Sequence, residues 1–225
     1  NRNPLVSIVI TYYRKKKYIR KTLLSILNQT YKNYEIILVY DDANKTDLKL
    51  IQNLLIKFKK KRLIINNKNL GVAKSRNIAV NYCKGSYIAF IDADDVWKKK
   101  KLNKQLNFMI CNSYSFSFTS YAVINDKDKI LSYRKVISDA KYNNLVNSNF
   151  IGLSTVIVEK KLFSKIKFPN LKTQEDFALW LNLLRKGYKL RHLKAILSCW
   201  RNSKNSLSSN MFQKAPTLRK QKRHM

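Results

Sequence analysis

The chain has 225 residues, of which 45% are hydrophobic, and it carries a formal net charge of +33 at pH 7. This length and composition predict one globular domain with a sizeable core. The three cysteines are odd in number, widely spaced and without a CxxC pair, which argues against a disulfide framework or a zinc site and favours a reducing, cytoplasmic setting.

Strands and helices alternate over the first half of the chain. Continuous apolar, β-branched runs predict buried strands, and apolar residues three or four apart predict helices. In chain order these are a strand over 5–10, a helix over 16–29, a strand over 35–39, a helix over 47–60, a strand over 63–65, a helix over 72–83 and a strand over 87–91. This alternation predicts a three-layer, Rossmann-like α/β fold with a mostly parallel sheet flanked by helices and right-handed crossovers.

The second half is less regular. The pattern predicts a helix over 100–110, a polar-alternating strand over 115–124, a turn over 125–129, a hairpin return over 130–132, a strand over 155–158, a short helix over 160–166 and an amphipathic helix over 175–186. In the last helix we expect Phe177, Leu181 and Leu184 to face the core. No apolar stretch approaches the roughly 20 residues that span a bilayer, so any membrane contact is expected at the surface.

Acidic residues are scarce and clustered. There are 13 of them, and seven lie in three clusters: Asp41-Asp42, Asp92 with Asp94-Asp95, and Glu175-Asp176. Clustered carboxylates repel one another unless a cation lies among them or a pKa is shifted. Helix capping explains one acid in a cluster and stays open for the third cluster, which begins a helix. Three aspartates within four residues indicate a metal site instead.

Two of these clusters follow predicted strands directly. Asp41-Asp42 comes after the strand over 35–39, and Asp92 follows the strand over 87–91. Ligands of open α/β sheets bind beyond the carboxyl ends of the strands. The sequence therefore predicts a ligand site at this edge of the sheet.

Five segments in this order resemble a known family. They are VSIVITYY (6–13), SILNQTYKNYEIILVYDD (25–42), NLGVAKSRN (69–77), GSYIAFIDADDVW (85–97) and QEDFALWLNLLRKGY (174–188), with a weaker likeness in CWRNSKNSLS (199–208). They resemble the family-2 inverting glycosyltransferases with the GT-A fold, which build bacterial surface polysaccharides. The resemblance covers roughly residues 5–208.

The resemblance implies a nucleotide site. Thr11 and Tyr12 would lie under the base, and Asp41 and Asp42 would hold the base and ribose. Arg76 matches an arginine of the family that reaches the nucleotide. Tyr40 stands where the Asp-Asp pair of the family often begins, so the assignment within the pair stays open by one residue.

The resemblance also implies the catalytic groups. Asp92-Ala93-Asp94 matches the nucleotide-sugar-binding and metal-binding DxD motif, in which Asp92 faces the ribose and Asp94 coordinates Mn²⁺ or Mg²⁺ across the diphosphate. Asp176 matches the catalytic base of the Glu-Asp pair that it forms with Glu175. A carboxylate with a raised pKa suits removal of a proton from an attacking hydroxyl group.

The implied activity is inverting, metal-dependent transfer of a sugar from a nucleotide-diphosphate sugar, most commonly a UDP-sugar, to a hydroxyl of a glycan or lipid-linked glycan. The implied setting is synthesis of O-antigen, capsule or lipopolysaccharide in the cytoplasm, with peripheral contact on the inner, anionic face of the plasma membrane. We expect one GT-A domain over 1–208, with a nucleotide-binding half over 1–98 and an acceptor-binding half over 99–208. A basic tail over 209–225 follows, and Lys204 is a candidate phosphate contact.

Other interpretations stay open. The high charge suggests attraction to nucleic acid or to anionic lipid, but codon bias in an AT-rich genome also produces lysine-rich chains. We expect no nucleic-acid partner, because no binding module is recognisable and the Tyr and Phe residues that can be placed fall mostly in predicted core strands and helices. We interpret the lysine runs over 15–17, 59–62 and 98–101 as solvated helix ends. A nucleotidylyltransferase would need a glycine-rich phosphate loop after the first strand, where no glycine occurs. A catalytically inactive GT-A relative is the remaining alternative.

Overall fold

A single mixed sheet of nine strands runs through the computed structural model, which describes residues 3–203. Its order is β3-β2-β1-β4-β8-β6-β9-β5, with β7 paired to β6 off this path. The strands are β1 (Val6–Tyr12), β2 (Tyr34–Tyr40), β3 (Lys61–Ile65), β4 (Tyr87–Phe90), β5 (Val96–Trp97), β6 (Phe116–Ile124), β7 (Ile130–Arg134), β8 (Ile157–Glu159) and β9 (Arg191–Arg201).

Most strands of this sheet run in one direction, and β8 lies among them as an antiparallel strand. β1 pairs in parallel with β2 and β4, and β2 with β3, as the alternating first half predicts. β8 is antiparallel to both β4 and β6, whereas β6 and β9 are parallel to each other. The carboxyl ends of β1, β2 and β4 therefore open on one edge, where the predicted ligand site lies.

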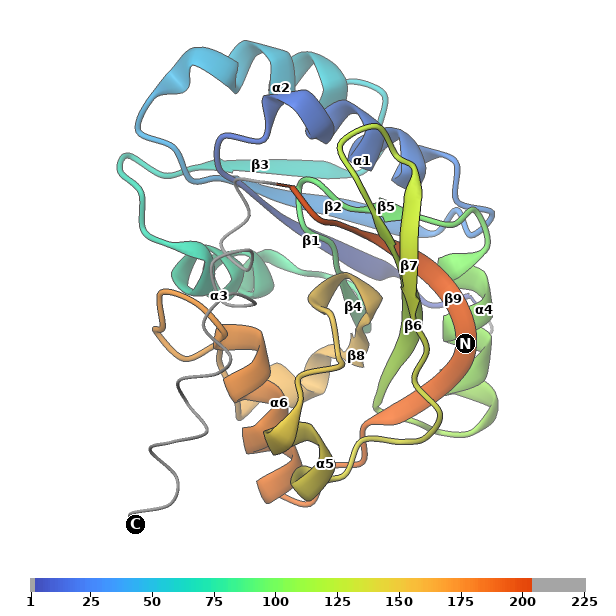
Figure 1. Cartoon of the computed structure of the whole chain (residues 1–225). Helices are drawn as coiled ribbons and strands as arrows, with labels where there is room; N and C mark the ends of the chain where they lie inside the picture. The colour runs from blue at the N-terminus through green and yellow to red at the C-terminus, as the bar shows by residue number, and fades with distance from the viewer. Residues whose placement is uncertain (1–2, 204–225) are drawn as a thin grey trace, which may run out of the picture.

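Helices cover both faces of the sheet (Figure 1). They are α1 (Lys16–Leu27), α2 (Leu48–Leu55), α3 (Val72–Tyr82), α4 (Lys101–Cys111), α5 (Tyr142–Asn147) and α6 (Glu175–Arg185), with 3-10 turns η1 (Lys45–Asp47), η2 (Leu153–Thr155) and η3 (Lys160–Ser164). One buried cluster joins Ile8 of β1 to α1, α2 and α4. The other joins Val9 to α3 and α6. Neighbouring residues of β1 thus face opposite layers, as strand geometry requires.

Several predicted elements are corrected. The strand over 115–124 was expected to alternate between apolar and polar environments, but β6 is almost entirely buried because it lies inside the sheet between β8 and β9. In α6 the expected inward residues Phe177, Leu181 and Leu184 do pack against the core, although they are only partly buried. The fully buried side chains of this helix are Leu179, Trp180 and Leu183, which the pattern did not single out. β5, α5 and β9 have no counterpart among the predicted elements.

Two of the three lysine runs also need correction. Lys101 is fully buried, and its amine donates to Gln105 at 2.7 Å. Burial lowers the pKa of Lys101 well below its ordinary value. Lys15 is only partly exposed and forms an ion pair, described below. Among residues 3–203, no helix is long and apolar enough to cross a membrane.

Candidate active site

Arg76 joins three segments of the chain at the carboxyl edge of the sheet. It lies in α3 and is almost completely buried. Its Nη2 donates to Asp92 Oδ1 at 2.7 Å, and its Nη1 forms an ion pair with Glu175. The guanidinium also lies 5.5 Å from the ring centre of Phe168. A buried arginine is stable only with such partners. Arg76 therefore fixes the turn over 92–95, called the DxD turn below, against the start of α6.

The pair Glu175-Asp176 occupies the first turn of α6. Gln174, just before it, has a φ of +61°, the left-handed conformation that a non-glycine residue adopts at an energetic cost. Helix capping does not account for Glu175, because its carboxylate binds the guanidinium of Arg76. Asp176 Oδ1 accepts a hydrogen bond from the backbone N–H of Phe177 at 2.7 Å.

The carboxyl group of Asp176 has an unusual affinity for its proton. Burial raises the pKa of Asp176 from 3.8 to about 6, the charge of Arg76 opposes the rise, and those of Glu175 and Asp92 add to it. A group with this pKa is mostly ionised at neutral pH and still basic enough to take a proton from a hydroxyl that attacks an electrophile.

The DxD turn presents its three aspartates to different surroundings. Asp92 has a side chain that is 35% exposed, and Asp94 one that is 12% exposed. Asp94 Oδ2 lies 2.6 Å from the Lys15 amine, which precedes α1. Ala93 is buried, and its carbonyl accepts a hydrogen bond from Thr22. Asp92 and Asp94 therefore stand at the edge of the site, each beside a side-chain cation.

Asp95 points into the protein instead. Its carboxylate accepts hydrogen bonds from Ser154 Oγ at 2.6 Å and from the backbone N–H of Arg201 at 2.9 Å. Burial, with the nearby charges of Asp94 and Asp92, raises the pKa of Asp95 well above its ordinary value. This third aspartate holds the turn in place.

Asp41 and Asp42 follow β2, as predicted, and both are buried. The carboxylate of Asp41 accepts from Asn66 Nδ2 at 2.7 Å and from the backbone N–H groups of Leu70 at 2.8 Å and Gly71 at 3.0 Å. It thereby ties β2 to the loop that leads into α3. Asp42 accepts from its own turn and from Arg14 Nε at 3.3 Å.

Tyr12 is a correction to the predicted nucleotide site. Its ring has no exposed surface, stacks on Tyr40 at a centroid distance of 5.1 Å, and donates its hydroxyl hydrogen to Asp47. It therefore offers no surface to a base. Thr11 is partly exposed at the carboxyl end of β1, and Tyr13, next along the chain, is 42% exposed.

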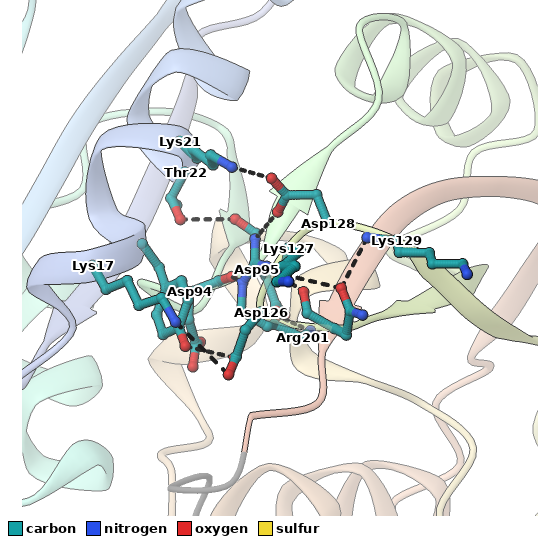
Figure 2. Close-up of polar contacts among 12 residues, drawn as sticks. Lys17, Lys21, Thr22, Asp94, Asp95, Asp126, Lys127, Asp128, Lys129 and Arg201 are labelled. Atoms are coloured by element: carbon teal, nitrogen blue, oxygen red, sulfur yellow. Dashed lines mark hydrogen bonds and ion pairs between the residues drawn. The ribbon is translucent and has the colours of Figure 1, made fainter.

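Two cationic side chains beside Asp94, those of Lys15 and Arg201, were not predicted from the sequence. Arg201 lies at the end of β9 and is fully buried, and its Nε donates to the Asp94 carbonyl at 2.8 Å. Its Nη2 pairs with Asp128 of the β6–β7 turn at 2.6 Å (Figure 2). Neither residue carries a local signal, because the partners are distant in sequence. Lys204 and the basic tail lie outside the described residues.

The carboxylates of Asp92 and Asp94 would hold a hard divalent cation only together with the phosphates of a bound substrate. Within residues 3–203 no group of three or more His, Cys, Asp or Glu side chains is placed to hold a metal ion. Asp92 and Asp94 supply two carboxylates, and Mg²⁺ is commonly held by one or two carboxylates plus substrate phosphates and water. The two side chains suit such a shared site.

Two cavities lie elsewhere. The larger, of about 610 Å³, opens between α3 and η3 and is lined by residues such as Val80, Lys160 and Phe163. The second, of about 340 Å³, adjoins it and shares Val80 and Phe163. None of the predicted site residues lines either cavity, so the chemistry suggested by the acid clusters belongs to the strand ends and not to these hollows.

Sequence comparisons match the chain to a known family and to named relatives. Residues 7–169 match the profile of the family described as Glycosyl transferase family 2. The chain is 38% identical to the Escherichia coli UDP-Glc:alpha-D-GlcNAc-diphosphoundecaprenol beta-1,3-glucosyltransferase WfaP, over 93% of this chain and 82% of WfaP. It is 33% identical to WfgD of the same organism, which has the same named activity, over 93% of this chain and 81% of WfgD.

Solved structures agree as well. S. aureus TarS 1–349 in complex with UDP-GlcNAc superposes with a TM-score of 0.72 at 21% identity, over 91% of this chain. The chain spans 60% of the length of that TarS fragment. The same fragment with UDP gives a TM-score of 0.69. The predicted GT-A fold is thereby confirmed.

Proposed function

The chain belongs to glycosyl transferase family 2, and from that premise we propose that it transfers a sugar from a UDP-sugar to a hydroxyl group of a lipid-linked glycan during synthesis of a cell-surface polysaccharide. Family membership makes it a glycosyltransferase. The donor, the acceptor, the stereochemistry and the metal are the parts that we propose.

One observation carries the proposal. The buried Arg76 bonds both to the DxD turn and to the start of α6, so that Asp92 and the Glu175-Asp176 pair come together although about two fifths of the described chain separates them. Asp94 adds a second carboxylate to the same turn. An acidic, cation-bridged edge of this kind suits a diphosphate leaving group on one side and a hydroxyl nucleophile on the other.

In the proposed reaction, the acceptor hydroxyl oxygen attacks the anomeric carbon of the donor sugar. The bond from that carbon to the diphosphate oxygen breaks, and the nucleoside diphosphate leaves with the bonding electrons. Asp176 accepts the hydroxyl proton and later releases it to water. This single displacement inverts the anomeric configuration. A pKa of about 6 suits Asp176 to this role at neutral pH.

We propose that Asp94 and Asp92 hold Mn²⁺ or Mg²⁺ together with the donor diphosphate. A divalent cation there would neutralise the negative charge that grows on the leaving group. Arg76 orients Asp92 through a hydrogen bond to its carboxylate, and Lys15 forms an ion pair with Asp94. The carboxylate of Asp176 is left for proton transfer.

UDP is the proposed nucleotide. WfaP and WfgD are named for UDP-Glc, and TarS 1–349 was crystallised with UDP and with UDP-GlcNAc. We assign Thr11 and Asp42 to the surface near the base and ribose. For Asp41 we propose an indirect part, because its carboxylate holds the Leu70–Gly71 backbone beside α3.

The proposed acceptor places the protein at a membrane surface. The named acceptor of WfaP and WfgD is a sugar on diphosphoundecaprenol. A polyprenyl chain stays in the bilayer, so an enzyme that uses such an acceptor works at the lipid surface. We propose a cytoplasmic protein bound peripherally to the inner face of the plasma membrane, where anionic lipids attract a net charge of +33.

The test is transfer of radiolabelled sugar from UDP-Glc and UDP-GlcNAc to synthetic GlcNAc-diphospholipid, with and without Mn²⁺. We expect metal-dependent transfer from one donor, with the anomeric configuration inverted when the product is analysed by NMR. If UDP binds but neither sugar transfer nor donor hydrolysis occurs, with or without Mn²⁺, the inactive GT-A relative would be favoured. Retention of configuration would exclude the single displacement.

A further inference from the structure

The hairpin formed by β6 and β7 carries an unusually exposed run of residues. All five residues of β7 are exposed, and β7 pairs only with β6 among the described strands. Apolar side chains share this exposure: Leu131 is 53% exposed, Tyr133 is 51% exposed and Ile137, just beyond the strand, is 84% exposed. Exposed apolar side chains concentrated in one short segment commonly mark an interaction surface.

Lysines flank these apolar side chains. Lys127, Lys129 and Lys135 are exposed in the same hairpin. We define the hairpin surface as Lys127, Lys129, Leu131, Tyr133, Lys135 and Ile137.

The acids of the hairpin face the other way. Asp126 accepts a hydrogen bond from the Tyr18 hydroxyl at 2.6 Å and lies near Lys17. Asp128 pairs with Lys21 and with the buried Arg201. Figure 2 shows both aspartates turned toward these cations, while the Lys129 amine points away from them. The hairpin surface therefore presents positive charge whose acidic neighbours are already neutralised by α1 and β9.

The turn of the hairpin contacts the proposed active site through Arg201. Arg201 binds both Asp128 of the turn and the Asp94 carbonyl of the DxD motif. In β6, Tyr121 pairs with Arg134 of β7. Burial raises the pKa of Tyr121, the charge of Arg134 opposes the rise, and the charges of Asp95 and Asp176 add to it. The turn end of the hairpin surface thus lies beside the carboxyl edge of the sheet, and β7 runs back from that edge along β6.

We propose that the hairpin surface docks the protein on an anionic lipid bilayer. Lysines would contact the anionic headgroups, while Leu131, Tyr133 and Ile137 would enter the interfacial region. The proposal rests on the proposed function, because a lipid-linked acceptor requires the catalytic edge to approach the membrane. A second copy of the chain is the competing occupant of an edge strand, but exposed lysines discourage edge pairing and two chains of net charge +33 repel each other.

The experiment measures flotation of the full chain with vesicles of phosphatidylcholine alone and of phosphatidylcholine containing phosphatidylglycerol. The double variant Lys129→Gln/Lys135→Gln should lower partitioning onto the anionic vesicles by about thirtyfold, since each surface lysine contributes roughly fivefold. Leu131→Ser/Ile137→Ser should also weaken binding, and added salt should weaken the wild type. The matched control is Lys57→Gln/Lys59→Gln with Ile56→Ser, which removes two lysines and one apolar side chain that are exposed beyond α2.

The outcomes separate this proposal from the proposed function. UDP binding is measured on the same variants by thermal shift. Docking through the hairpin is supported if the hairpin variants lose vesicle binding and keep UDP binding, while the control variant keeps both. The proposal is overturned if the hairpin and control variants lose vesicle binding equally, or if the wild type does not bind vesicles. It is also overturned if the wild type dimerises with rising concentration and the hairpin variants do not. A wild type that binds vesicles but no nucleotide would contradict the proposed function alone.

Discussion

Asp41 and Asp94 both follow parallel strands at the same edge of the sheet, yet the protein satisfies their carboxylates in different ways. The Asp41 carboxylate accepts hydrogen bonds from two backbone N–H groups and one side-chain amide, and the loop before α3 holds all three donors in place. Asp94 is paired with the amine of Lys15, at the end of a long side chain. Fixed N–H donors cannot leave a carboxylate without unfolding the loop, whereas a lysine amine can exchange with another cation.

This difference predicts which acids hold the fold together and which bind a ligand. Within the DxD turn alone, Asp95 resembles Asp41, because Ser154 and the backbone of Arg201 hold it. Asp92 and Asp94 are balanced by side-chain cations. We expect substitutions of the first kind to reduce stability and substitutions of the second kind to change ligand binding and rate.

The largest effect is expected at Asp176. Asp176→Asn keeps an oxygen for the Phe177 N–H but removes the base, so kcat should fall by about 10²- to 10⁴-fold. UDP binding should be unchanged, as measured by thermal shift. Asp126→Asn, at an acid of the β6–β7 turn, is the control and should retain most of the rate. A loss of less than tenfold in Asp176→Asn would remove this residue from proton transfer.

Asp41→Ala should cost stability. It leaves two backbone N–H groups without an acceptor and removes one of the two acceptors of the Asn66 amide, so the free energy of unfolding should fall by about 3 kcal/mol. Urea denaturation measures this change. Asp94→Ala, the matched substitution at a pair held by a lysine, should change stability by no more than about 1 kcal/mol, because burial disfavours the Asp94 carboxylate and raises its pKa, which offsets the attraction of Lys15. Equal losses in the two variants would show that the type of partner does not distinguish these acids.

Lys15→Ala should strengthen metal binding. Lys15 and a divalent cation compete for Asp94, so removing the amine should lower the Kd for Mn²⁺ in the presence of UDP by about tenfold. Titration calorimetry measures this affinity directly. Lys16→Ala is the control, because Lys16 pairs with Asp47 outside the DxD turn. Weaker Mn²⁺ binding in Lys15→Ala would mean that Lys15 supports the cation instead of opposing it.

The pH dependence should be the mildest effect near neutrality. Asp176 acts as a base only when ionised, and its pKa of about 6 predicts that kcat/KM falls by about half between pH 7 and pH 6 and then tenfold per pH unit. The same shift has the opposite sign for stability. Between pH 3.8 and 6 the folded state binds the proton more tightly than the unfolded state, so the contribution of Asp176 to stability declines as pH rises. Asp176→Asn should show neither the fall in kcat/KM below pH 7 nor this pH dependence of stability.

Local patterns explain what could be predicted. β1, β2 and β4 are short apolar runs between helical periods, and the acid clusters directly follow two of them, so their shared edge followed from parallel topology. β9 was missed because its sequence alternates charged and apolar residues irregularly, and β5 because it has only two residues. These strands are defined by their neighbours in the sheet.

Side-chain environment was harder to predict than position. Tyr12 is the last residue of β1, two residues beyond the end of the predicted strand, and its ring stacks on Tyr40 of the neighbouring strand, a contact that depends on register. Lys15 sits in a run of three lysines, and nothing local distinguishes it from Lys16 and Lys17. Only the fold brings it to Asp94. Arg201 likewise acquires its partners from segments more than 70 residues away.

The most direct test is a thermal-shift panel of UDP, GDP, ADP and CDP, each with and without Mn²⁺, on the wild type and on Asp94→Ala. A ligand present at 100 times its Kd stabilises the native state by about 2.7 kcal/mol, which raises the melting temperature measurably. We predict a rise with UDP that needs Mn²⁺ and is lost in Asp94→Ala. No rise with any nucleotide, or an equal rise in the variant, would contradict a donor site built on the DxD turn.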